Sequence, residues 1–221
     1  MAGRSLCVVL AASVLAGFGA PAQEGVVRGR VLQPEVKVRH EARPSVGAIE
    51  PVMYAPVDRR VAVVYLDVAP RQAFEPMPAR RARMNQRNEQ FVPRVLAVTV
   101  GTVVDFPNND LPFHNVMSLA PGNSFDLGRY PRGQSRSVHF DTPGIVPVIC
   151  DIHTHMSAYI LVFSHPFFAV TDTEGRYALS GVPAGTHALK VWSELGIANP
   201  QVVTMGSEPL EADFTVVRPS R

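Results

Sequence analysis

Prolines and glycines interrupt this chain of 221 residues at such short intervals that they leave little room for a long helix. The sequence holds 20 Pro and 16 Gly, and the runs between them are rich in Val, Ile, Phe and Tyr, which favour strands. Few segments repeat apolar residues at helical spacing over three turns, whereas many alternate apolar and polar residues. The chain therefore predicts an all-β protein of the sandwich type.

The expected strands lie between turn signals made of Gly, Pro, Asn and Asp. They span residues 26–31, 61–68, 94–100, 103–106, 135–140, 145–150, 157–163, 168–171, 176–179, 186–191 and a last stretch near 212–217. The stretch 34–56 is rich in proline and has no periodic pattern, so we expect a loop there.

The first 22 residues have the layout of a cleavable secretory signal. Arg4 precedes an apolar run over residues 6–20, and the small-residue pattern Ala20-Pro21-Ala22 ends it. This run is too short for a transmembrane helix, and no other segment could span a bilayer. We therefore expect an exported product of residues 23–221, periplasmic or secreted, with no membrane span.

Cleavage of this signal would remove Cys7 and leave Cys150 as the single cysteine of the exported chain. Cysteines of exported proteins usually pair in disulfides. A leftover cysteine indicates a reactive thiol, an intermolecular bridge or a metal ligand.

The charge balance argues against nucleic acid as a partner. The net charge is +2, and Arg80-Arg81-Ala82-Arg83 is the one basic cluster. We interpret this cluster as a solvated strand edge; the alternative is a docking surface for an acidic partner.

The stretch from Cys150 to Met156 is the most informative in the chain. It holds a thiolate, two imidazoles (His153 and His155) and a thioether within seven residues, a ligand set that suits a soft or borderline metal. A short loop between two antiparallel strands can aim Cys, His and Met at one point but rarely supplies a fourth strong ligand.

His114 is the natural fourth ligand, because it follows the turn after an earlier strand and so lies at the same end of the sandwich. Two His, one Cys and a weak axial Met form the ligand set of a blue-copper electron-transfer site. We therefore expect one copper ion per chain. Zinc also accepts Cys and His, but copper binds such sites more tightly where it is available.

Several motifs resemble one known family over residues 80–164. Phe91-Val92-Pro93 and the alternating stretch 96–108 resemble its opening strands, His114-Asn115-Val116 its first-histidine motif, and Phe140-x-x-Pro143-Gly144 its last hairpin. That family is the cupredoxins, and within it the chain is most similar to amicyanin. The resemblance implies a cupredoxin Greek-key β-sandwich.

The spacing of the ligand loop discriminates among cupredoxins. Amicyanin has Cys-x2-His-x2-Met, which Cys150, His153 and Met156 fit. The plastocyanin spacing would need Met in place of Ala158. The azurin spacing could use His155 but would need Met in place of Tyr159.

The resemblance also implies a role for Asn115, which in cupredoxins bridges the two ligand loops and hydrogen-bonds toward the Cys sulfur. Two residues depart from the family pattern. Pro147 interrupts the strand before Cys150, so we expect that position to face a sheet edge. His155 is an additional histidine in the loop, which leaves it open as an alternative ligand to His153.

The tail resembles a second family. Phe168-x-Val170-Thr171-Asp172-x-x-Gly175-x-Tyr177 and the turn Pro183-x-Gly185 are similar to the closing half of a carboxypeptidase regulatory-like (transthyretin-like) sandwich. This implies a second small β-sandwich domain formed by residues 166–221 and completed by two strands from residues 23–69. The cupredoxin domain, residues 70–165, would then be inserted into it, and strand 61–66 would pair in a sheet with the tail.

We expect a type 1 copper protein that passes single electrons between redox protein partners. The alternative is a copper-delivery module or a structural adaptor. An enzyme is not expected, because a site closed by four ligands offers a substrate no position. His40, His139, His165 and His187 lack ligand partners by spacing and are interpreted as structural or surface residues. The sequence leaves the oligomeric state open.

Overall fold

The computed structural model describes residues 24–35, 42–43, 52–53, 59–69, 80–206 and 208–219. The expected signal over residues 1–22, most of the expected loop over 34–56 and His40 lie outside the described residues. Within these ranges the chain is built of strands and turns, so the prediction of an all-β fold is confirmed. No helix in the described part is long and apolar enough to cross a membrane.

The strands follow in sequence order. They are β1 (Glu24–Leu32), β2 (Ala42–Arg43), β3 (Val52–Met53), β4 (Ala62–Leu66), β5 (Arg81–Arg83), β6 (Asn85–Arg87), β7 (Gln90–Val92), β8 (Val95–Thr99), β9 (Thr102–Pro107), β10 (Met117–Ser118), β11 (Phe125–Asp126), β12 (Ser135–Phe140), β13 (Gly144–Ile149), β14 (Ser157–Phe163), β15 (Phe168–Val170), β16 (Arg176–Pro183), β17 (Gly185–Ser193), β18 (Gln201–Met205), β19 (Leu210–Glu211) and β20 (Phe214–Thr215).

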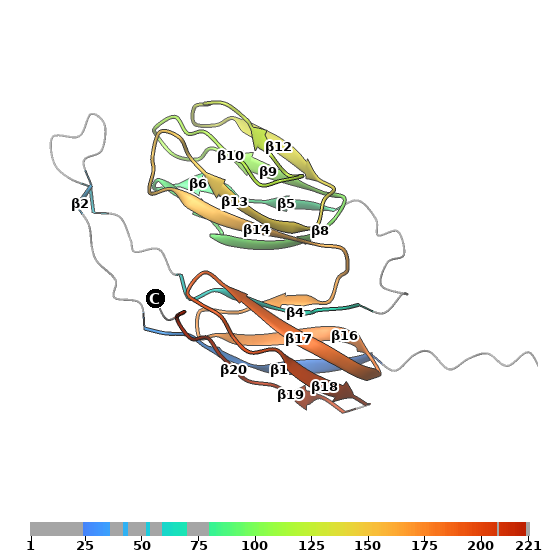
Figure 1. The fold of residues 1–221 in the computed structure, drawn as a ribbon. Helices are drawn as coiled ribbons and strands as arrows, with labels where there is room; N and C mark the ends of the chain where they lie inside the picture. The colour runs from blue at the N-terminus through green and yellow to red at the C-terminus, as the bar shows by residue number, and fades with distance from the viewer. Residues whose placement is uncertain are drawn as a thin grey trace, which may run out of the picture.

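These strands form two sandwiches that lie one above the other (Figure 1). The central sandwich, residues 80–163, consists of a five-stranded sheet of order β11-β10-β13-β14-β8 and a three-stranded sheet of order β12-β9-β5. The terminal sandwich pairs a sheet of β16, β1, β19 and β20 with a sheet of order β15-β4-β17-β18.

The two strands at the contact between the sandwiches, β4 and β14, are buried on both faces. In β4, Val64 and Leu66 belong to the core of the terminal sandwich, while Val63 faces the central sandwich. In β14, Ile160 belongs to the core of the central sandwich, while Leu161 packs against Val63. Because successive side chains of a strand point to opposite faces, continuous apolar runs are needed where both faces are covered.

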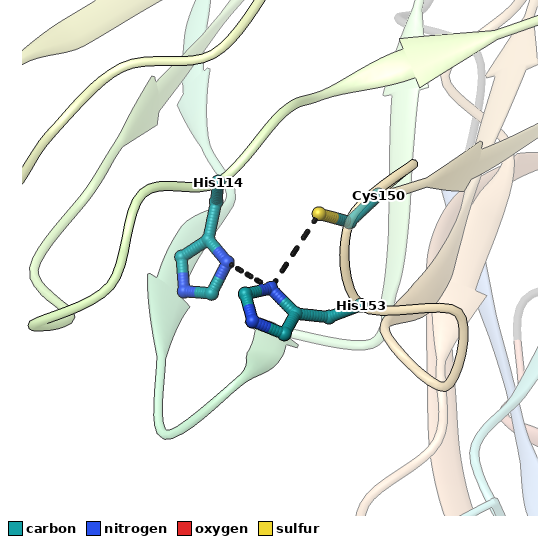
Figure 2. Close-up of side chains that lie close together, drawn as sticks. All are labelled: His114, Cys150 and His153. Atoms are coloured by element: carbon teal, nitrogen blue, oxygen red, sulfur yellow. Dashed lines mark hydrogen bonds between the residues drawn. The ribbon is translucent and has the colours of Figure 1, made fainter. Parts of the chain in front are cut away.

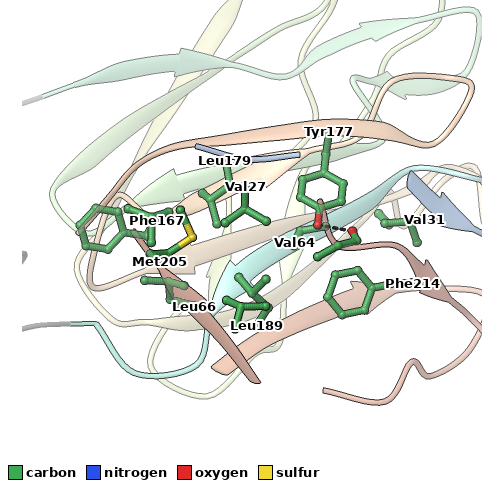
Figure 3. Close-up of a cluster of buried hydrophobic side chains, with 14 of the residues drawn as sticks. Val27, Val31, Val64, Leu66, Phe167, Tyr177, Leu179, Leu189, Met205 and Phe214 are labelled. Atoms are coloured by element: carbon green, nitrogen blue, oxygen red, sulfur yellow. Dashed lines mark hydrogen bonds between the residues drawn. The ribbon is translucent and has the colours of Figure 1, made fainter. Parts of the chain in front are cut away.

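The terminal sandwich joins the two ends of the described chain. β4 pairs antiparallel with β15 and with β17, and β1 pairs with β16, β19 and β20. The pairing that the insertion hypothesis requires is therefore present, with residues 80–163 lying in sequence between β4 and β15. The core of this sandwich is apolar, and the Tyr177 hydroxyl in it donates to the carbonyl of Ala212 at 2.6 Å (Figure 3).

The basic cluster near residue 81 lies at a sheet edge, as expected. Among the described strands, β5 pairs with β9 alone, which makes it an edge strand of its sheet. Arg81 is exposed and donates to the Asp105 carboxylate at 2.6 Å.

Pro147 also lies where its missing N–H is tolerated. The backbone N–H of Cys150 donates to the Met156 carbonyl, so it points toward β14. Because backbone N–H groups along an antiparallel strand point alternately toward and away from the partner strand, the nitrogen of Pro147, three residues earlier, points away from β14. On that outer side, β10 pairs with β13 only at Met117 and Ile149. The expectation that this proline faces an edge agrees with the structure.

Candidate metal centre

The loop that carries three predicted ligands is closed at its neck by the backbone. It connects β13 to β14, and the Cys150 N–H donates to the Met156 carbonyl at 3.1 Å. Within the loop, the Met156 N–H donates to the His153 carbonyl at 2.8 Å. These two bonds fold the short loop back on itself and turn its side chains toward the end of the sandwich.

His114 reaches the same end from the segment between β9 and β10. Its N–H donates to the Tyr130 carbonyl at 3.3 Å, and the Tyr130 N–H donates to the His114 carbonyl at 3.0 Å. The Asn108 amide donates to the carbonyls of Pro112 and Tyr130. Asn108, predicted only as part of a turn, thus fixes the segment that carries His114.

The structure brings His114, Cys150 and His153 together (Figure 2). Their donor atoms all lie within 4.8 Å of one another. The Nδ1 atoms of the two histidines are 3.0 Å apart, and the Cys150 sulfur is 3.9 Å from His153 Nδ1. His114 is fully buried and Cys150 is 2% exposed.

These separations fit one metal ion. In zinc sites, histidine nitrogens lie about 2.0–2.1 Å, and cysteine sulfurs about 2.3 Å, from the metal. Two such nitrogens are therefore at most about 4.2 Å apart, and a nitrogen and a sulfur at most about 4.4 Å. The separations of His153 Nδ1 from His114 Nδ1 and from the Cys150 sulfur both fall inside these limits, so His153 lies at ligand spacing from each of the other two side chains.

Met156, the predicted axial ligand, is fully buried. It belongs to the same core cluster as Cys150 and Val116, and its backbone closes the loop. Its assignment as the fourth ligand stays a prediction.

Asp110 is a residue of the site that the sequence analysis missed. Its Oδ2 lies 3.0 Å from His114 Nε2, so a proton on Nε2 would leave Nδ1 free to bind a metal. Burial lowers the pKa of His114, against the opposing effect of Asp110. Burial raises the pKa of Asp110, but hydrogen bonds from the Glu89 N–H and from His114 outweigh it, and the net pKa is lowered. A carboxylate four residues before a candidate ligand was the available signal.

Asn115 contacts the sulfur through its backbone. Its N–H donates to Cys150 Sγ at 3.5 Å, a contact that would stabilise a thiolate. Among the described residues, the side-chain Oδ1 of Asn115 is a buried atom with no hydrogen-bond partner. The bridging role that the cupredoxin resemblance implies for this side chain stays a prediction.

His155 points to a different group. Its Nε2 lies 3.0 Å from the carboxylate of Glu89, whose side chain is 5% exposed. The rings of His155 and His153 have centroids 6.0 Å apart. His155 is therefore outside the converging group formed by His114, Cys150 and His153.

The remaining described histidines lie apart from this group. His139 contacts Asp141 on the surface, and His187 contacts the Pro183 carbonyl. His165 is buried, with its Nδ1 accepting from the Phe167 N–H at 3.2 Å. The structural or surface roles expected for these three residues agree with these contacts.

Solved structures similar to this chain include a purple cupredoxin from Nitrosopumilus maritimus, at 22% identity and a TM-score of 0.34, over 37% of this chain and 98% of that one. A reduced amicyanin mutant matches at 22% identity and a TM-score of 0.35, over 36% and 79% of the two chains. Another amicyanin mutant, described as Cu(I), matches at 20% identity and a TM-score of 0.36, over 37% and 81%. No protein-family model and no curated protein matches the sequence.

Proposed function

We propose that this chain is an exported type 1 copper protein that transfers single electrons between redox partners. The observation that carries the proposal is the convergence of His114, Cys150 and His153 within 4.8 Å. One thiolate and two imidazoles, with Met156 as a weak fourth ligand, suit both Cu(I) and Cu(II). Bound copper would supply the one-electron chemistry by cycling between these two oxidation states.

The protein residues hold this ligand set ready. Because burial lowers the pKa of His114, its ring is neutral at neutral pH, and Asp110 orients it from the far side. The Asn115 N–H stabilises negative charge on the Cys150 sulfur. Rigid ligands change little between the two oxidation states, and little reorganisation favours fast electron transfer.

Burial supports a role in electron transfer rather than in catalysis. His114, Cys150 and Met156 are at most 2% exposed, whereas His153 is partly exposed, so three of the four proposed ligands are shielded from solvent. Four closing side chains would leave no ligand position for a substrate. We propose that the chain is not an enzyme.

A surface for a redox protein partner is available beside the ligands. Phe113 and Ile152 directly precede His114 and His153 in the sequence, and they are 55% and 37% exposed. Leu111, nearby in sequence, is 79% exposed. Exposed apolar side chains that lie together mark interaction surfaces, so we propose that these three form a patch at this end of the central sandwich on which a partner docks.

Cyclic voltammetry of the copper-loaded chain in the presence of a Cu(I) chelator tests this function. An electron carrier gives reversible oxidation and reduction waves and keeps its copper through many cycles. Loss of the waves with transfer of Cu(I) to the chelator would contradict the proposal and favour copper delivery.

A further inference from the structure

We propose that the terminal sandwich holds the metal-binding loop in position, through an ion pair that joins Glu194 to Arg94. The inference rests on the proposed function only in taking the loop 150–156 as a metal-binding loop. It assigns the terminal sandwich a positioning role at the metal centre.

The ion pair crosses the contact between the two sandwiches. Arg94 directly precedes β8 of the central sandwich, and Glu194 directly follows β17 of the terminal sandwich. Arg94 Nε donates to Glu194 Oε1 and Arg94 Nη2 donates to Oε2, each at 2.8 Å. The two side chains are 8% and 6% exposed. This two-point geometry fixes the plane and direction of the guanidinium.

The third nitrogen of the same guanidinium bonds Ser157, the first residue of β14, directly after the metal-binding loop. Arg94 Nη1 donates to the Ser157 carbonyl at 2.6 Å and to the Ser157 hydroxyl at 3.3 Å. Ser157 directly follows Met156, whose carbonyl closes the loop by accepting from Cys150. The guanidinium therefore holds the backbone next to the neck of the loop, with its orientation set by the terminal sandwich.

Glu194 is itself held in a fixed turn. The Leu195 N–H donates to the Ser193 hydroxyl at 3.1 Å, and Ser193 forms a backbone bridge with Gly196. A side chain at Gly196 would collide with the Val217 carbonyl, because a Cβ there would lie 2.1 Å from that oxygen. The turn that presents Glu194 is thus packed tightly against the end of the chain.

Adhesion between the sandwiches does not explain this pair. Apolar and aromatic contacts already join them, including Val63 against Leu161 and Tyr159 against Trp192, whose ring centroids are 5.0 Å apart. A buried ion pair adds little stability compared with apolar residues of similar size, and its best-attested role is to select one conformation among alternatives. Here the fixed geometry is that of Ser157.

The test compares Glu194→Gln with Val63→Ala. The first variant keeps the shape of the side chain but removes the charge that orients Arg94. The second weakens the apolar contact between the sandwiches and leaves the ion pair intact. Amide hydrogen exchange of Cys150 and Met156 is measured in the metal-free protein, so that the result does not depend on copper.

Glu194→Gln is expected to speed exchange at these two amides by roughly tenfold or more, and to speed loss of bound Cu(II) by a similar factor. Val63→Ala is expected to lower the unfolding midpoint without this local effect. Equal exchange in the wild type and Glu194→Gln, or an equal change in both variants, would overturn the inference.

Arg94→Lys provides a second variant in case Glu194→Gln does not fold. It keeps the positive charge but cannot reach Glu194 and the Ser157 carbonyl together, so the same rise in exchange is expected; unchanged exchange would overturn the inference. A wild-type protein that gives no copper–thiolate band would contradict the proposed function instead, and the exchange measurements would still decide the role of the ion pair.

Discussion

The two sandwiches of this chain have similar architecture but differ in what they bury. The described central sandwich buries many polar side chains, namely Gln86, Glu89, Thr99, Thr102, Asn108, His114, Asn115, Ser118 and Asn123. In the described terminal sandwich the buried polar residue is Thr171, and His165 lies at the passage between the two. The terminal core is otherwise apolar.

Hydrogen bonds connect several of the buried polar side chains in the central sandwich. The Tyr130 hydroxyl donates to the Phe106 carbonyl at 2.7 Å and accepts from the Gln86 amide at 2.6 Å. Tyr130 also holds the backbone of His114. Buried polar groups need such hydrogen-bond partners. Here the chain of hydrogen bonds leads to His114, a proposed metal ligand. The comparison shows that buried polar side chains of the central sandwich position other side chains, whereas the terminal sandwich has an apolar core that serves as a scaffold.

The substitution with the largest expected effect is Cys150→Ser. It removes the thiolate and should abolish the intense copper–thiolate absorption, while the fold persists because a small side chain replaces a small one. Visible absorption and circular dichroism after addition of Cu(II) check this. Survival of the intense band in the variant would place the thiolate elsewhere and break the assignment of function to the central sandwich.

Leu189→Ala tests the scaffold side of the comparison. Leu189 is fully buried in the terminal core (Figure 3), and truncation of such a residue costs about 2–5 kcal/mol. Denaturant unfolding should show this loss. Below the unfolding transition the copper spectrum should match that of the wild type, whereas a changed spectrum would mean that the terminal core shapes the metal centre directly.

His165 lies in the segment that connects the two sandwiches, and it is expected to make the unfolding free energy depend on pH. Burial lowers its pKa, against an opposing backbone hydrogen bond with Leu66. The stability that the neutral ring contributes is therefore complete above the unfolded pKa of about 6.5 and is lost as the pH falls through the folded pKa.

His165→Gln should remove this dependence. The difference in unfolding free energy between the wild type and the variant should shrink from pH 7 to pH 5, by at most about 1.4 kcal/mol per pH unit. The contribution of His114 is present in both proteins and cancels. Denaturation curves at several pH values give the difference, and a constant difference would contradict a neutral, buried His165.

His155→Ala should have the smallest effect on the copper spectrum. His155 faces Glu89 rather than the converging ligands, so the thiolate band should keep its position and most of its intensity. Loss of the band would show that His155, not His153, is the second imidazole ligand.

Strand patterns predicted much of the fold, because alternation is visible in the sequence. The bounds of β12 and β14 match the prediction, and the apolar run around β4 marks a strand covered on both faces. The short strands β6, β10 and β11 were not predicted, and neither was the five-residue strand β18. β6, β10 and β11 each have two or three residues, too few to show a period, although β6 pairs with the nearby β7 and β10 with the nearby β11.

The sequence predicted the metal ligands of the candidate site but not the residues that hold them in place. Cys150 and His153 stand out by spacing, and His114 by its position after a strand. Asp110 was missed although it lies only four residues before His114, whereas Glu89 was missed because it meets His155 only in the folded chain. Arg94 and Glu194 are 100 residues apart in sequence, and no local sequence pattern predicts a contact between residues so far apart.

The most direct test of the central claim is the visible absorption and EPR spectrum of residues 23–221 after addition of Cu(II), and then after ascorbate. A single converging set of His114, Cys150 and His153 predicts an intense thiolate-to-copper band that bleaches on reduction and returns on reoxidation. A Cu(II)-treated protein without a thiolate band would contradict the assignment of these residues as a type 1 copper centre.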